Sequence, residues 1–148
     1  MHVAVSADEL TGVAAAIVED LERRGISLVR HGAYAEDERD DWAYASELAA
    51  RDVAEGRAEQ AIVACWTGTG ASIAANKVPG IRAALCPDAQ TADGARRWND
   101  ANVLALSLRK TSEAALSEIL DAWFEGRPSA DQADAENVAH LTEIERAE

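Results

Sequence analysis

The sequence is poor in cysteine, in positive charge and in long apolar runs. Its two cysteines, Cys65 and Cys86, have no histidine or cysteine neighbour at metal-ligand spacing, so we expect reduced thiols and no bound metal. Lys and Arg number 14 against 27 Asp and Glu, and the formal net charge of -13 disfavours nucleic acids and anionic membrane surfaces as partners. No stretch is long enough to span a bilayer, and no signal-peptide pattern is present. These deficits predict a cytoplasmic protein without membrane contact.

Strand-like and helix-like segments alternate along the 148 residues, a length that suits one domain. The pattern predicts strands at Val3–Ala7, Ile26–His31, Ala61–Trp66, Ile81–Leu85 and Val103–Ser107, and helices at Thr11–Arg24, Trp42–Glu55, Ser72–Lys77, about Thr91–Trp98, Ser112–Glu125 and about Ala135–Arg146. Such alternation predicts an α/β fold, a three-layer sandwich with a five-stranded parallel sheet and helices on both faces. Ligands of such folds bind at the carboxyl ends of the strands, and we expect Asp8, Cys65 and Asn99 at that edge.

The last predicted helix has a thin apolar stripe, formed by Val138, Leu141 and Ile144. Such a stripe is too narrow to pack well on the helix's own domain alone. We therefore divide the chain into an α/β domain, residues 1–127, and a C-terminal linker and helix, residues 128–148, which we expect to pack on a partner subunit.

Chemistry is most expected in the segment from Cys65 to Cys86. The apolar run that ends at Trp66 is followed by Thr67, Gly68, Thr69 and Gly70, and then by a predicted short helix. The unpaired amides of a helix N-terminus favour a negative group and would stabilise a thiolate beside them. By itself the pattern also fits a small apolar residue beside a tight turn, or a phosphate-binding loop that catalyses nothing.

Four matched segments, in order and at the right spacing, make the pattern specific. The segments Cys65–Gly70, Ser72–Lys77, Pro79–Ala83 and Asn99–Leu104 resemble the Cys-Gly-Thr-Gly-x-Gly, Ser-Ile-Ala-Ala-Asn-Lys, Pro-Gly-Ile-Arg-Ala and Asn-Asp-x-Asn-Val-Leu motifs of one sugar-phosphate isomerase family. That family contains type B ribose-5-phosphate isomerase and the subunits of galactose-6-phosphate isomerase. The resemblance extends over about residues 1–127. It implies a Rossmann-like aldose–ketose isomerase that needs no metal or organic cofactor and acts on a small sugar or sugar phosphate.

The resemblance also implies an assembly and roles for single residues. It implies a homodimer or a tetramer of two such dimers, with the C-terminal helix exchanged and the active site at the subunit interface. Cys65 would be the base, Thr67 would handle hydroxyl protons, and backbone amides around Gly68–Ala71 would hold the anion. The expected substrate-binding residues are Asp8, Glu9, Gly68, Thr69, Gly70, Ala71, Ser72, Trp98, Asn99, Arg109 and Arg127. The two arginines stand at positions where family members bind phosphate, although each could equally be a surface charge or cap a helix carbonyl.

Several positions depart from the family pattern. Glu9 and Trp98 replace histidines, Trp66 replaces the glycine after the cysteine, and Asn137 or His140 stands near the place of another phosphate-binding arginine. A carboxylate near a phosphate is unfavourable, because like unit charges about 4 Å apart cost roughly 4 kcal/mol at an effective dielectric of about 20. We therefore expect a substrate that differs from ribose 5-phosphate: unphosphorylated, differently phosphorylated or acyclic. The alternative is a noncatalytic sugar- or phosphate-binding subunit of the same family.

Overall fold

Strands and helices alternate throughout the computed structural model, which describes residues 1–147. The strands are β1 (His2–Ala7), β2 (Ser27–Gly32), β3 (Gln60–Cys65), β4 (Ala83–Leu85) and β5 (Val103–Ser107). The helices are α1 (Ala14–Arg23), α2 (Trp42–Ala54), α3 (Thr69–Asn76), α4 (Ala89–Asn99), α5 (Glu113–Glu125) and α6 (Gln132–Arg146).

The five strands form one parallel sheet with the order β2-β1-β3-β5-β4. Strand β3 lies at its centre, and all six of its residues are buried, as its nearly unbroken apolar sequence requires of a strand covered on both faces. The register pairs Ala7 of β1 with Ala64 of β3, and Cys65 of β3 with Ser107 of β5. The carboxyl ends of these three strands therefore meet at one edge, and the predicted α/β fold is confirmed.

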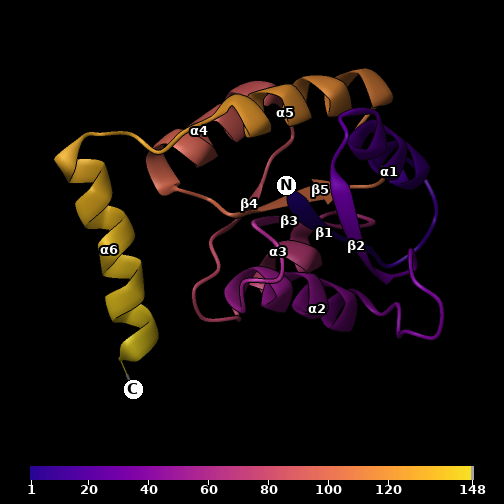
Figure 1. The fold of residues 1–148 in the computed structure, drawn as a ribbon, viewed down its shortest axis with the longest axis horizontal. Helices are drawn as coiled ribbons and strands as arrows, with labels where there is room; N and C mark the ends of the chain where they lie inside the picture. The colour runs from indigo at the N-terminus through magenta and orange to yellow at the C-terminus, as the bar shows by residue number, and fades with distance from the viewer. Residues whose placement is uncertain (148) are drawn as a thin grey trace.

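The helices form two layers around this sheet (Figure 1). Helices α1, α4 and α5 cover one face, and α2 and α3 cover the other. Trp123 of α5 is fully buried, and its indole nitrogen donates a hydrogen bond of 3.0 Å to the side-chain oxygen of Gln60 at the start of β3. Buried polar groups are stable only when paired in this way, so this contact fixes α5 on the sheet.

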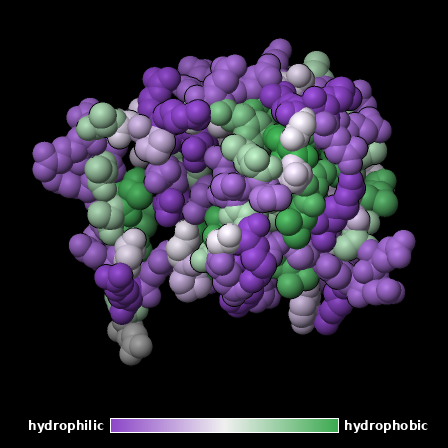
Figure 2. Space-filling view, in the orientation of Figure 1, coloured by the Kyte–Doolittle hydropathy of each residue, from purple (hydrophilic) through white to green (hydrophobic). Residues whose placement is uncertain are grey.

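Helix α6 stands apart from both layers (Figure 1). None of its residues is buried, and Leu141 and Ile144 remain 40% and 56% exposed. The carboxylate of Glu145 accepts two hydrogen bonds, of 3.0 and 3.1 Å, from the backbone amide of Gly80. Apolar atoms lie on the flank of α6 that faces the rest of the molecule (Figure 2). The predicted thin stripe is therefore present, and it finds little to pack against within its own chain.

Several element boundaries differ from the sequence prediction, and α6 begins at Gln132 rather than about Ala135. Helix α1 begins at Ala14 rather than Thr11, because Gly12, at φ 55°, makes a turn so tight that a Cβ there would lie 2.1 Å from the carbonyl oxygen of Leu108. Strand β4 begins two residues later than predicted, since the amide of Arg82 bonds to the Asn102 side chain instead of a strand partner. Helix α3 begins earlier, at Thr69. Among residues 1–147, no helix has the length and apolarity needed to cross a bilayer.

Candidate active site

The turn between β3 and α3 lies at the carboxyl edge of the sheet. Gly68 is the N-cap of α3 and has a left-handed backbone with φ 80°. A Cβ at this position would lie 2.6 Å from Leu85 Cδ1 and 2.9 Å from the carbonyl carbon of Leu106. Glycine is therefore required both for the backbone conformation and for the close approach to β5. This tight turn brings the start of α3 directly over the end of β3.

Cys65 ends β3 beneath this turn. Its Sγ accepts a hydrogen bond of 3.2 Å from the amide of Gly68, so the sulfur lies on the side of the turn. Only 4% of the residue is exposed, and a substrate must therefore approach along the residual opening at the turn. The amide of Gly68 and the N-terminus of α3 both direct partial positive charge toward this sulfur.

The first turn of α3 supplies free amide donors. The amide of Ser72 already bonds to the carbonyl of Gly68 at 3.1 Å, which leaves only its side chain available to a ligand. The amides of Thr69, Gly70 and Ala71 have no acceptor within residues 1–147. The hydroxyls of Thr67 and Thr69 share a hydrogen bond of 2.8 Å at the mouth of the turn. Three amides and two hydroxyls thus gather beside Cys65.

Carboxylates flank the turn on the β1 side. Asp8 directly follows β1, whose last residue pairs with Ala64, so it lies next to Cys65 across the sheet. One carboxyl oxygen of Asp8 is buried without a hydrogen-bond partner in residues 1–147. Burial, followed by the charges of Glu9 and Asp40, raises the pKa of Asp8 above its usual 3.8. This side of the edge is therefore acidic, and the sequence prediction for Asp8 and Glu9 is consistent with their position.

Cations flank the turn on the β5 side. Arg109 lies two residues after β5, and its amide donates a hydrogen bond of 3.1 Å to the carbonyl of Trp66. A cavity of about 390 Å³ opens here, lined by Thr67, Leu85, Cys86, Pro87, Ser107, Arg109, Lys110 and Thr111. Arg109 thus lies at the predicted edge. Lys110 was not predicted, although its place next to Arg109 in the sequence was a signal.

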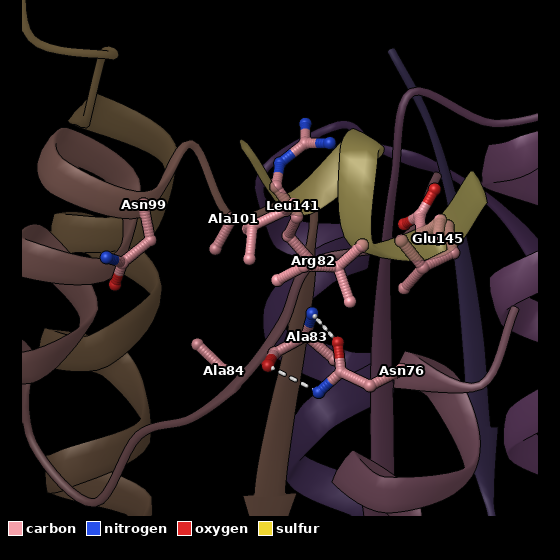
Figure 3. Close-up of a pocket in the computed structure, with 10 residues that line it drawn as sticks. Asn76, Arg82, Ala83, Ala84, Asn99, Ala101, Leu141 and Glu145 are labelled. Carbon is pink, nitrogen blue, oxygen red and sulfur yellow. Dashed lines mark hydrogen bonds between the residues drawn. The ribbon is translucent and has the colours of Figure 1, made fainter. Parts of the chain in front are cut away.

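Trp98 and Asn99 lie at the opposite edge of the sheet, so the prediction that Asn99 approaches Asp8 and Cys65 is wrong within one chain. Helix α4 runs antiparallel to the strands and ends at Asn99, near the beginnings of β4 and β5. From Val103 to Ser107, four steps of about 3.3 Å separate the two edges by roughly 13 Å. Asn99 instead shares a cavity of about 440 Å³ with Arg82, Leu141 and Glu145 (Figure 3).

Arg127 also lies away from Cys65, just after the end of α5. Its guanidinium donates hydrogen bonds of 3.2 and 2.9 Å to the carbonyls of Phe124 and Gly126. These contacts match the carbonyl cap that the sequence left open as an alternative to phosphate binding. Trp66, a residue that is 47% exposed, directly follows the last residue of β3, and its narrowing of the pocket stays a prediction.

Two features of this edge were not predicted from the sequence. The ring of Trp42, at the start of α2, packs on Gly70 of α3, where a Cβ would lie 2.8 Å from the ring. Asp40, in the acidic loop before α2, lies close enough to influence the charge of Asp8. Only the packing of α2 beside α3 brings this loop to the edge.

Comparison with known proteins agrees with this geometry. The family model described as Ribose/Galactose Isomerase matches residues 3–141. Ribose-5-phosphate isomerase B of Escherichia coli is 37% identical over 130 residues, which cover 88% of this chain and 86% of that protein. Galactose-6-phosphate isomerase subunit LacB of Clostridium acetobutylicum is 34% identical over 128 residues, 86% of this chain and 73% of that one.

The solved structures give the same result. Ribose-5-phosphate isomerase B of Clostridium thermocellum superimposes with a TM-score of 0.88 at 34% identity, over 99% of this chain and 98% of that one. The agreement covers the sheet, both helical layers and the C-terminal helix. From motifs, fold and site together, the chain belongs to the ribose/galactose isomerase family.

Proposed function

We propose that this chain interconverts an aldose and a ketose, with Cys65 as the catalytic base. The reaction class is that of the family, whose members include isomerases of ribose 5-phosphate and of galactose 6-phosphate. One observation carries the assignment to this site: the amide of Gly68 donates to Cys65 Sγ at the point where the free amides of α3 begin. A base and an anion-binding group thus lie side by side.

The steps follow from this pairing. The thiolate of Cys65 removes a proton from the carbon next to the substrate carbonyl, and the electron pair moves onto the carbonyl oxygen. The resulting enediolate oxygen accepts hydrogen bonds from the amides of Thr69, Gly70 and Ala71, which are already oriented by the helix. The protonated sulfur then returns its proton to the neighbouring carbon. Thr67 transfers a proton between the two substrate oxygens, so the reaction is balanced without a cofactor.

Asp8 and Glu9 define what the site accepts near the β1 side. Two carboxylates there accept hydrogen bonds from sugar hydroxyls, and they repel a phosphate placed beside them. A small sugar or sugar phosphate other than ribose 5-phosphate fits this arrangement best. The free thiols Cys65 and Cys86 suit the reducing cytoplasm, where such reactions occur.

A second copy of the chain completes the site in this proposal. Trp98 and Asn99 cannot reach Cys65 of their own chain, so they contribute only to the site of a partner, in a homodimer or in a tetramer of two such dimers. The unburied stripe of Leu141 and Ile144 supports packing of residues 128–148 on the partner rather than on the domain of residues 1–127. Arg127 contributes if it exchanges its carbonyl contacts for a ligand.

Deuterium exchange tests the proposal against a noncatalytic binding subunit. Aldoses and ketoses of four to six carbons, with and without phosphate, are incubated with the protein in heavy water and examined by NMR. We expect one pair to interconvert with deuterium incorporated at the carbon next to the carbonyl, and Cys65→Ala to abolish the exchange. Saturable sugar binding that Cys65→Ala leaves intact, without exchange in any sugar, would identify the noncatalytic subunit instead.

A further inference from the structure

A histidine outside the candidate site lies between two carboxylates. His31, near the end of β2, has its Nε2 2.6 Å from Asp52 Oδ2 of α2, and its Nδ1 3.0 Å from Glu38 Oε1 of the loop between β2 and α2. The imidazole is 13% exposed, and the side chains of Asp52 and Glu38 are 5% and 30% exposed. An ionised carboxylate only accepts hydrogen bonds, and a neutral imidazole has a single N–H. Both contacts therefore form together only while His31 is an imidazolium ion.

The two carboxylates are held in different ways. Asp52 is buried on a helix, and its second oxygen accepts a hydrogen bond of 2.7 Å from Nε of Arg57, which also pairs with Glu55. Glu38 lies on a loop and is more exposed. When the ring of His31 loses one proton, the remaining N–H therefore stays on the shorter, buried contact with Asp52. Glu38 then faces the lone pair of Nδ1, and the two repel each other.

The sheet brings no further charge to the ring. The register partner of His31 on β1 is Ser6. Arg30 precedes His31 on β2, so alternation along the strand directs its side chain to the opposite face, where it pairs with Glu22 of α1. The charged groups that face the imidazole are thus those of α2 and the loop, and the charge of the ring alone decides how many carboxylates it binds.

The loop that carries Glu38 has a strained backbone. The chain turns back toward β2 at Asp37, whose φ of 61° is left-handed and costs free energy in a residue other than glycine. Such a conformation persists where surrounding contacts fix it. Here the next residue, Glu38, accepts hydrogen bonds from the ring of His31 and, at 3.2 Å, from the amide of Gly32. Loss of the contact with the ring therefore also removes a restraint on the turn.

The same loop reaches the active-site edge two residues later. The negative charge of Asp40 acts on Asp8, which follows β1 and lies next to Cys65 across the sheet. The place of Glu38 on β2 therefore fixes where Asp40 stands on the side of the site that is proposed to bind sugar hydroxyls.

We propose that His31 is a positioning residue, which as an imidazolium ion holds the loop of residues 33–41 against the β1 side of the active site and releases it on losing a proton. The inference rests on the proposed function, to which it adds a dependence on pH. At low pH the ring binds both carboxylates, and the loop is held. As the pH rises, the ring keeps Asp52 and releases Glu38, and this side of the site opens.

Nuclear magnetic resonance tests the contact without requiring turnover. Amide and imidazole signals of the full chain are followed from about pH 5 to about pH 9, which spans the usual change of charge of histidine. Glu38→Gln is the main variant, because its amide accepts from a charged ring and donates to a neutral one. His31→Phe removes the contact, and His140→Phe is the matched control, since it removes an exposed histidine–carboxylate pair on α6. The melting temperature of each variant establishes that it is folded.

In the wild type and in His140→Phe, we expect the amide signals of residues 33–41 to shift with the same midpoint as the ring of His31. In Glu38→Gln this shift should be largely lost, and in His31→Phe the signals should match the high-pH spectrum of the wild type throughout. Loop signals that do not follow His31, or that titrate unchanged in Glu38→Gln, would overturn the proposal.

Steady-state kinetics distinguishes positioning from a merely structural role. With the sugar identified by deuterium exchange, KM of the wild type should rise about fivefold as His31 loses its proton, the scale of one hydrogen bond to a charged group at a partly exposed site. Glu38→Gln should lose this rise, while its kcat follows the wild type. The same pH dependence of KM in both proteins would overturn the proposal. If the loop follows His31 and no sugar is isomerised, the proposed function fails and the positioning of the loop stands.

Discussion

Two turns at the same edge of the sheet each place a cysteine before a helix, and they are built in opposite ways. Cys65 precedes α3, and Cys86 follows β4 and precedes α4. The N-cap of α3 is Gly68, which has no side chain, so the first amides of the helix stay free. The N-cap of α4 is Asp88, whose carboxylate accepts a hydrogen bond of 2.7 Å from the amide of Thr91.

The two sulfur atoms differ accordingly. Cys65 Sγ accepts a hydrogen bond from the amide of Gly68, whereas Cys86 Sγ donates one of 3.6 Å to the carbonyl of Ala84. Burial, and then the charge of Asp88, raises the pKa of Cys86 to about 12. A cysteine between a strand and a helix is therefore not reactive by position alone. What matters is whether the helix N-terminus is left open to an external anion or is already filled by the chain's own carboxylate.

The largest expected effect concerns the base. Cys65→Ala should lower kcat by about 10³-fold, the typical contribution of a positioned general base. Steady-state kinetics with the sugar identified by deuterium exchange measures kcat of both proteins, and the melting temperature is the control for folding. A kcat within tenfold of wild type would place the base elsewhere and remove the contrast between the two cysteines.

Substitution of Gly68 should break the open turn itself. Gly68→Ala introduces a Cβ at φ 80° and within 2.9 Å of the backbone of Leu106, and we expect a loss of about 2 kcal/mol in unfolding free energy. Gly56→Ala is the matched control, since Gly56 has φ 79° and open space around it, and should lose only about 1 kcal/mol. Urea denaturation measures both. Equal losses would mean that the contact with β5 is unimportant.

Substitution of Asp88, the N-cap of α4, should have a smaller effect than substitution of Gly68. Asp88→Ala removes the cap of α4 and should lower the free energy of unfolding. Asp88→Asn keeps the oxygen acceptor and should cost less. Both should lower the pKa of Cys86, because each removes the nearby negative charge. Ultraviolet titration of the thiolate, with Cys65→Ala as the background, measures this. An unchanged titration would assign the raised pKa to burial alone.

The smallest expected effect is the change in protein stability with pH that the ionisation of Asp8 causes. Since its folded-state pKa is raised above 3.8, the native protein loses stability as the pH rises through 3.8 toward the folded value. Asp8→Asn escapes this loss, so it should be more stable than wild type at neutral pH and should approach wild type below pH 3.8. Urea midpoints across this range measure the difference. A variant less stable than wild type at neutral pH would contradict the prediction.

The sequence predicted the local elements of the site but not their distribution around the sheet. The glycine turn after Cys65 follows from residue types alone, because only glycine accepts the backbone of Gly68. The position of Asn99 does not follow from residue types, because the loop before β5 and the loop after β3 look equally polar in sequence. Helix α4 runs antiparallel to the strands, so the loop before β5 lies at the opposite edge of the sheet from the loop after β3. In the proposed dimer, a site divided between these two ends of the sheet is complete only between two copies.

Alternation of apolar segments, turn glycines and the motifs from Cys65 to Leu104 determined the parallel α/β architecture and the family, since these depend on residue types that lie close together in the sequence. Only the tertiary structure decided which cysteine faces free amides, that Arg127 caps α5, and that Lys110 lines the same cavity as Thr67 of the β3–α3 turn. The physical reason is that charge pairing and access to a helix N-terminus depend on neighbours distant in the chain. Packing brings those neighbours together, and sequence spacing does not record them.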